Sequence, residues 1–177
     1  MDIFTAAEKL MGMDDDAWAR HANPWSGYTR IAAAAPIFLA IWSAHWIGWW
    51  SLVPIGMVVT WVFINPRLWP APTLVDTWIG KGVLGERAWI NRKTVAVPDH
   101  HAVFANLTIA LSAAFVLMAI YGFVVADFWA AFGGWFGAVL AKCWFIDRMV
   151  WLWADMKDAH PVYKSWANAD WSARFPT

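Results

Sequence analysis

Carboxylate, imidazole and guanidinium side chains cluster in two parts of the sequence, one ending at residue 101 and one near residue 148. Carboxylates and imidazoles can act as acids, bases or metal ligands, and arginines can hold a phosphate through paired hydrogen bonds. The candidate catalytic residues are Glu86, Asp99, His100 and Asp147, with Arg87, Arg92 and Arg148 beside them. Because ion-pair networks use the same residue types, we expect these side chains to form salt bridges that hold a loop in place rather than an active site.

The tandem histidines His100 and His101, with the adjacent Asp99, are the candidates for a metal site. Imidazole and carboxylate groups are ligands for zinc and iron. The sequence has no pair of histidines three or four residues apart, and adjacent residues on a helix point about 100° away from each other. We therefore favour no metal site and expect no stoichiometric zinc or iron.

Other catalytic signatures are missing from the sequence. There is no Walker lysine loop and no GxSxG nucleophile motif. Cys143 is the single cysteine, which excludes an internal disulfide and a cysteine-cluster zinc site. The 13 basic residues balance the 13 acidic ones, which argues against nucleic acid as a partner. These absences favour a protein without catalytic activity.

The elements that must position these side chains are membrane helices. The chain of 177 residues is 60% hydrophobic, only 15% charged, and contains 17 tryptophans. A soluble domain carries about 25% charged residues, and tryptophan concentrates at membrane–water interfaces. Residues 31–65 hold no charged side chain, and residues 102–141 hold only Asp127. Each stretch is long enough for two spans of about 20 residues, so each predicts a helical hairpin.

The predicted fold is all-α, an integral membrane bundle of four transmembrane helices in two hairpins. The predicted helices are residues 25–46, 49–68, 101–125 and 128–151, with turns near Ile47-Gly48 and Ala126-Asp127. All thirteen Lys and Arg residues then lie on one side of the membrane. The positive-inside rule places that side, with both termini and the middle loop, in the cytoplasm. The chain is thus predicted to be a multi-pass protein of the inner (cytoplasmic) membrane.

The predicted organisation has five segments. They are an N-terminal amphipathic cytoplasmic segment (1–24), a first transmembrane hairpin (25–68), a cytoplasmic loop with an interfacial helix (69–100), a second hairpin (101–154) and a cytoplasmic tail (155–177). The loop and the interfacial helix form a cytoplasmic cap. Within the loop, Gly80, Gly82 and Gly85 predict an irregular or hairpin element after the short helix. An apolar stripe predicts a short N-terminal helix from Ile3, Ala6, Ala7, Leu10 and Met11.

Four tryptophans lie too deep in the predicted spans for an interfacial belt: Trp42, Trp61, Trp135 and Trp144. They could line a groove for a flat apolar ligand such as an isoprenoid, a carotenoid or a tetrapyrrole, with Lys142 and Arg148 beside it. Aromatic rings at helical spacing usually pack in the core or face lipid, so the spacing itself favours plain packing. Lys142 lies about 9 Å deeper than Arg148. Either the long alkyl chain of Lys142 lets its ammonium group reach the interface, or the ammonium group pairs with Asp76, Glu86 or Asp99 of the middle loop.

Small residues at a four-residue spacing predict close helix packing. One set on the last predicted span is Gly133, Gly137 and Ala141. Such a seam can join helices within one chain or between copies, so the sequence also allows a homo-oligomer or a partner in a membrane complex.

Several short motifs occur along the chain: Asn23-Pro24-Trp25-Ser26, Asn65-Pro66-Arg67-Leu68, the run from Lys81 to Arg87, Asn91-Arg92-Lys93, His100-His101 and the run from Trp144 to Trp151. Together they resemble a family of small prokaryotic membrane proteins known as a domain of unknown function. The resemblance covers residues 18–156. It implies a membrane protein and carries no implied activity.

The function expected from the sequence is non-enzymatic: a bundle that forms an assembly or binds an apolar ligand such as a lipid, an isoprenoid or a pigment, as a subunit of a larger complex or on its own. No cofactor is predicted beyond a bound lipid or pigment, and the lipid bilayer is the expected partner. One alternative is an enzyme, with or without a metal, that acts on a lipid or another amphiphile at the cytoplasmic rim. A transporter or channel fits least well, because only Lys142, Asp127 and His45 place ionisable groups near a path.

Overall fold

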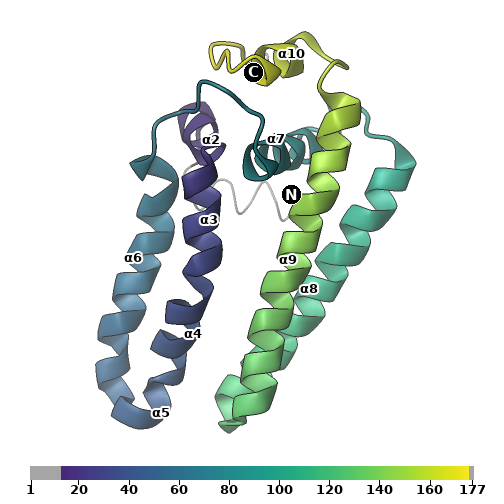
Figure 1. Cartoon of the computed structure of the whole chain (residues 1–177). Helices are drawn as coiled ribbons and strands as arrows, with labels where there is room; N and C mark the ends of the chain where they lie inside the picture. The colour runs from purple at the N-terminus through teal and green to yellow at the C-terminus, as the bar shows by residue number, and fades with distance from the viewer. Residues whose placement is uncertain (1–12, 176–177) are drawn as a thin grey trace.

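The computed structural model describes residues 13–175, and every regular element within them is helical (Figure 1). The stripe predicted at Ile3, Ala6, Ala7, Leu10 and Met11 lies outside the described residues. Three helical stretches in the described part are long and apolar enough to cross a membrane. They are Pro24–Leu68, Asp99–Val125 and Phe128–Met156.

The stretch Pro24–Leu68 folds back on itself. Its descending leg consists of α3 (Pro24–Ala32), α4 (Ala34–Trp42), α5 (Ala44–Ile47) and the 3-10 turn η1 (Gly48–Ser51), and its ascending leg is α6 (Leu52–Leu68) (Figure 1). The reversal occurs at Gly48, whose φ of 55° is a conformation that favours glycine. The break between α3 and α4 at Ala33 lies just before Pro36, which cannot donate a hydrogen bond to the preceding turn.

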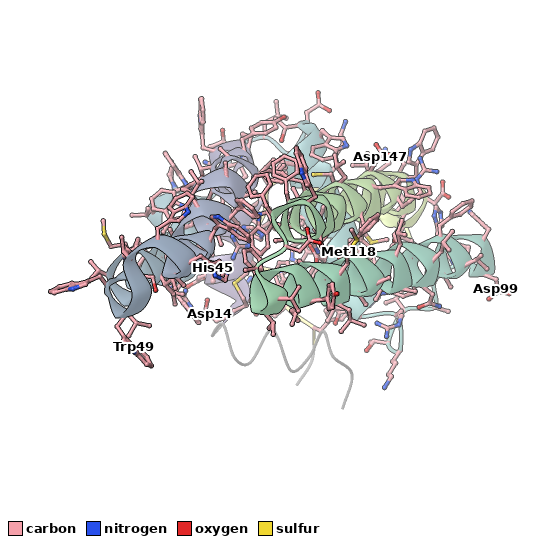
Figure 2. All side chains as sticks on the ribbon, turned by 90° about the horizontal axis from the view of Figure 1, so that it is seen from below. Asp14, His45, Trp49, Asp99, Met118 and Asp147 are labelled. Carbon is pink, nitrogen blue, oxygen red and sulfur yellow. The ribbon has the colours of Figure 1, made fainter. Side chains whose placement is uncertain are left out.

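The tip of this hairpin is covered with tryptophan. Trp49 is 86% exposed, and Figure 2 shows its ring pointing away from the protein. Trp50, beside it, is exposed as well. An exposed tryptophan at the end of an apolar hairpin is typical of an interfacial anchor.

The second hairpin consists of α8 (Asp99–Val125) and α9 (Phe128–Met156). Ala126 adopts a left-handed conformation, and the Asp127 carboxylate caps α9 by accepting hydrogen bonds from the backbone N–H groups of Trp129 and Ala130. The two backbones touch at glycines: a Cβ on Gly122 would lie 2.1 Å from the nitrogen of Ala131.

The close helix contact predicted at Gly133 occurs instead at the next residue, Gly134. A Cβ on Gly134 would lie 2.3 Å from the nitrogen of Ala119, whereas one on Gly133 would meet only Met118 Cε at 3.5 Å. Gly137 faces the ring of Phe115, and Ala141 is buried, so both belong to packed surface as expected. The seam lies within one chain.

Three short helices lie together at one end of the long ones, and we call them the short-helix layer. They are α2 (Asp15–His21), α7 (Trp78–Ile90) and α10 (Pro161–Ala167) (Figure 1). Arg87 of α7 joins all three, because its guanidinium pairs with Asp15 of α2 and stacks 3.8 Å from the ring centre of Trp166 in α10. The layer is therefore held by a buried cation as well as by apolar packing.

The prediction of an irregular element after the short helix of the loop is wrong, because α7 is continuous through Gly80, Gly82 and Gly85. A Cβ on Gly85 would lie 1.9 Å from the carbonyl oxygen of Met149 in α9, and one on Gly82 would lie 2.4 Å from Ile146. These glycines also have the GxGxxG spacing of a dinucleotide-binding turn, which requires a strand before the first glycine. Here they lie inside a helix: Gly82 and Gly85 allow its close packing on α9, whereas a Cβ on Gly80 would lie 3.1 Å from the carbonyl oxygen of Ala22.

Candidate functional site

A cavity of about 880 Å³ lies between the first hairpin on one side and α7, α8 and α9 on the other. Its walls are mostly aliphatic. They include Ile31, Ile41, Val116, Ile120 and Ala138. This volume is within the range of small-molecule binding sites, which is about 300–1,000 Å³.

The polar groups of this cavity are His21, Arg30, Glu86 and Lys142. Arg30 Nη1 donates to His21 Nε2 at 3.1 Å, and Lys142 Nζ lies 2.7 Å from Glu86 Oε1. Glu86 is on α7 and His21 is on α2, so both come from the short-helix layer. The cavity thus has an apolar body and a charged end next to that layer.

A chain of buried hydrogen bonds fixes the position of His21. Its Nδ1 lies 2.8 Å from Ser26 Oγ, and that hydroxyl donates to Asn65 Oδ1 at 3.1 Å. Asn65 Nδ2 in turn donates to Thr29 Oγ1 at 2.7 Å. Since Arg30 can only donate to Nε2, the ring proton of His21 lies on Nδ1. The chain ties α2 and α3 to the end of α6 and orients the guanidinium of Arg30.

The proposed ligand-binding residues divide between the cavity and other surfaces. Trp135 and Lys142 line the cavity, and Trp135 Nε1 donates to the backbone carbonyl of Ala34 at 2.8 Å. Trp42 does not line the cavity; it stacks on Phe38 in an aromatic cluster that Trp135 packs against.

The remaining three are outside the cavity. Trp61 is half-buried, Trp144 is 43% exposed, and Arg148 pairs with Asp147. Sequence reasoning missed Arg30 and His21 as residues that line the cavity. The sequence indicated Arg30 only as a charge that flanks a span, whereas the structure places it at the seventh position of α3, about two turns after the start of the helix.

The candidate catalytic residues do not meet in one site among the described residues. Glu86 pairs with Lys142, as one of the three partners considered for that lysine. Asp147 accepts hydrogen bonds from Arg148 and from Trp78 Nε1 instead. Asp99 begins α8 and is exposed. Glu86 and Asp147 are therefore in separate ion pairs.

The tandem histidines meet a carboxylate that sequence reasoning missed. His101 Nε2 lies 2.8 Å and His100 Nε2 lies 3.8 Å from Asp155 Oδ2 near the end of α9. One ligand atom from each of the three residues lies within 4.8 Å of the others. Asp155 replaces the predicted Asp99 in this group, because the antiparallel hairpin brings the end of α9 beside the start of α8. Only the pairing of the two helices gives this contact, and the sequence spacing does not reveal it.

Comparison with known proteins gives one family and no relatives of known structure or activity. No curated protein matches the chain, and no solved structure matches it. One family model does match, over residues 3–170, and its description is "Family of unknown function (DUF6653)". Since that model spans nearly the whole chain, the protein belongs to the DUF6653 family.

Proposed function

We propose that this protein is a membrane protein that binds an amphiphilic ligand in the cavity between its two hairpins. The observation that carries the proposal is the cavity itself, which combines about 880 Å³ of volume, aliphatic walls and a charged end. An apolar body of this kind suits an acyl, isoprenoid or pigment tail, and a few convergent polar groups suit a headgroup.

The proposed topology has four spans, with both termini and the short-helix layer in the cytoplasm. The fold-back at Gly48 divides Pro24–Leu68 into two legs, and α6 alone, with 17 residues, is about 26 Å long. The distribution of the 13 basic residues supports the orientation. The charged end of the cavity then lies at the level of the cytoplasmic headgroups.

In this proposal, the ligand enters the cavity laterally, from the hydrocarbon region of the bilayer. Ile120 and Val124 of α8 line the cavity and are nevertheless 53% and 77% exposed. A wall with exposed aliphatic side chains opens toward lipid rather than toward water. A ligand dissolved in the bilayer can therefore reach the cavity without crossing the short-helix layer.

Filling the cavity with Ala138→Trp is expected to exclude the ligand. Native mass spectrometry of protein extracted in mild detergent should show about one bound amphiphile per chain in the wild type, and at least about tenfold less in the variant. Ile120→Trp, from the facing helix, should have the same effect. Leu140→Trp is the matched control, since Leu140 is on α9 near Ala138 but is 69% exposed and outside the cavity. Equal ligand loads in all four proteins would contradict the proposal.

A second candidate function is metal-dependent chemistry at the membrane surface, which the group of His100, His101 and Asp155 favours. Two imidazoles and one carboxylate are a common set of zinc ligands, and a water completes the tetrahedron. Zinc held by these three residues would supply a Lewis acid and an activated water for hydrolysis of an ester bond in a lipid headgroup, with the alcohol as the leaving group. Small movements of the side chains would bring the ligand atoms to the usual zinc distances of about 2.0–2.2 Å.

This candidate predicts about one zinc ion per chain after dialysis against micromolar zinc, measured by elemental analysis. Asp155→Asn and the double variant His100→Ala/His101→Ala should lose the metal. His45→Ala, in α5 at the opposite end of the helices, should retain it. A wild-type protein without bound zinc would contradict this candidate. His101 and Asp155 would then be only a hydrogen-bonded pair that joins α8 and α9.

A further inference from the structure

We propose that the ligand of the inter-hairpin cavity carries an anionic headgroup, a carboxylate or a phosphate, and that Arg30 binds it. The inference rests on the proposed function and names the class of ligand. It follows from the charges at the polar end of the cavity, which do not cancel.

Two of the charged groups neutralise each other. Lys142 Nζ and Glu86 Oε1 form an ion pair at 2.7 Å. Burial holds the His21 imidazole neutral near pH 7, since it lowers the pKa of that ring to about 3. Two cations, one carboxylate and one neutral ring leave the polar end with a net charge of +1, and that charge is on Arg30.

The hydrogen-bond partners of Arg30 within the described part of the chain are neutral. Its Nη1 donates to His21 Nε2, and its Nη2 approaches the backbone carbonyl of Val62 at 3.5 Å. A guanidinium has five N–H donors, so most of them lack a strong acceptor. The carboxylate that acts on Arg30 through space, Glu86, is already paired with Lys142. A half-buried cation among apolar helices that shares its carboxylate neighbour in the cavity is costly, and an anion in the cavity would remove that cost.

The surroundings of Arg30 are those of a prearranged site. The hydrogen-bond chain through His21, Ser26 and Asn65 holds the acceptor for Nη1 in place. Arg30 is the seventh residue of α3, about 10 Å from the start of the helix, which is the depth of a headgroup whose tail points further into the bilayer. A planar guanidinium binds carboxylate and phosphate oxygens in pairs, which selects these headgroups over hydroxyl or amide ones.

The test compares three amphiphiles with the same tail. Hexadecanoate, hexadecyl phosphate and hexadecanol are titrated into delipidated wild-type protein in neutral detergent, and binding is followed by quenching of tryptophan fluorescence. We expect at least one of the two anions to bind about tenfold or more tightly than hexadecanol. Stronger binding of the carboxylate would indicate a free fatty acid, and stronger binding of the phosphate would indicate a phospholipid or a prenyl phosphate.

Arg30→Gln should remove the preference for anions while hexadecanol still binds. Arg67→Gln is the control, because Arg67 is an exposed arginine at the end of α6 outside the cavity. Arg30→Lys, which keeps the charge without the planar fork, should keep part of the preference. The wild-type comparison needs no variant, so it remains decisive even if Arg30→Gln does not fold.

The two proposals fail in different ways. If hexadecanol binds the wild type as tightly as both anions and Ala138→Trp blocks it, the cavity binds amphiphiles and the assignment of an anionic headgroup is wrong. If Arg67→Gln loses the preference as fully as Arg30→Gln, the effect comes from general surface charge, and the role of Arg30 is wrong. If none of the three amphiphiles binds and Ala138→Trp changes nothing, both proposals fail.

Discussion

Replacing Gly122 by alanine is expected to destabilise the second hairpin by about 2–3 kcal/mol, although only one methyl group is added. The new Cβ would lie 2.1 Å from the nitrogen of Ala131 and 2.6 Å from the carbonyl carbon of Ala130. Both are backbone atoms, so no side-chain rotation can relieve the overlap, and α8 must move away from α9. The free energy of unfolding, measured in detergent by titration with dodecyl sulfate, should fall accordingly.

The control for this prediction is Gly133→Ala in the same hairpin. Its Cβ would meet only the flexible tip of Met118, at an ordinary contact distance of 3.5 Å. Alanine also favours a helix over glycine by about 1 kcal/mol, so this variant should be as stable as the wild type or slightly more stable. Similar losses in both variants would show that α8 and α9 do not meet at Gly122.

Acid is expected to weaken the protein through His21. Burial, with smaller contributions from the charges of Arg30 and Lys142, lowers the pKa of this ring from 6.5 to about 3. Between these values the unfolded chain takes up a proton that the folded protein does not. The contribution of the neutral His21 ring to the free energy of unfolding is therefore fully present above about pH 6.5. It decreases by about 1.4 kcal/mol per pH unit as the pH falls toward 3.

The measurement is the unfolding midpoint as a function of pH between 7 and 4, in wild type and in His21→Gln. Glutamine can keep one hydrogen bond of the ring and does not titrate, so the variant should be less stable at pH 7 but lose less stability in acid. His45→Gln serves as the control, because His45 is an exposed residue close to the turn at Gly48. A pH dependence that is the same in wild type and His21→Gln would assign the effect to other groups.

The sequence predicted those parts of the fold that depend on local signals. Reversals at Gly48 and at Ala126–Asp127 follow from a glycine and a capping carboxylate between apolar stretches, and both occur there. All-helical structure follows from the same long apolar stretches. The pair of Lys142 and Glu86 was one of three considered, because the depth of the lysine limited its partners to the middle loop.

Features that depend on contacts between elements distant in the sequence were not predicted. The three glycines of α7 are helix breakers by propensity alone. Their role in a continuous helix depends on distant neighbours, because Gly82 packs on Ile146, Gly85 packs on the backbone of Met149, and Gly80 faces the backbone of Ala22. Asp155 joins the tandem histidines across 54 positions of sequence. The cavity needs the relative placement of both hairpins, so neither Arg30 nor His21 could be assigned to it from spacing.

The close backbone contacts at glycine are not spread evenly over the molecule. A Cβ added to Gly85, Gly122 or Gly134 would lie 2.3 Å or less from a backbone atom, and all three of these contacts join α7, α8 and α9. The first hairpin meets this unit through side chains, as where Gly27 faces Ile79, and through the hydrogen bond from Trp135 to Ala34. If the cavity binds an amphiphile as proposed, we expect the first hairpin to move relative to α7, α8 and α9, because a ligand tail could then be exchanged without separating the backbones that touch at glycine.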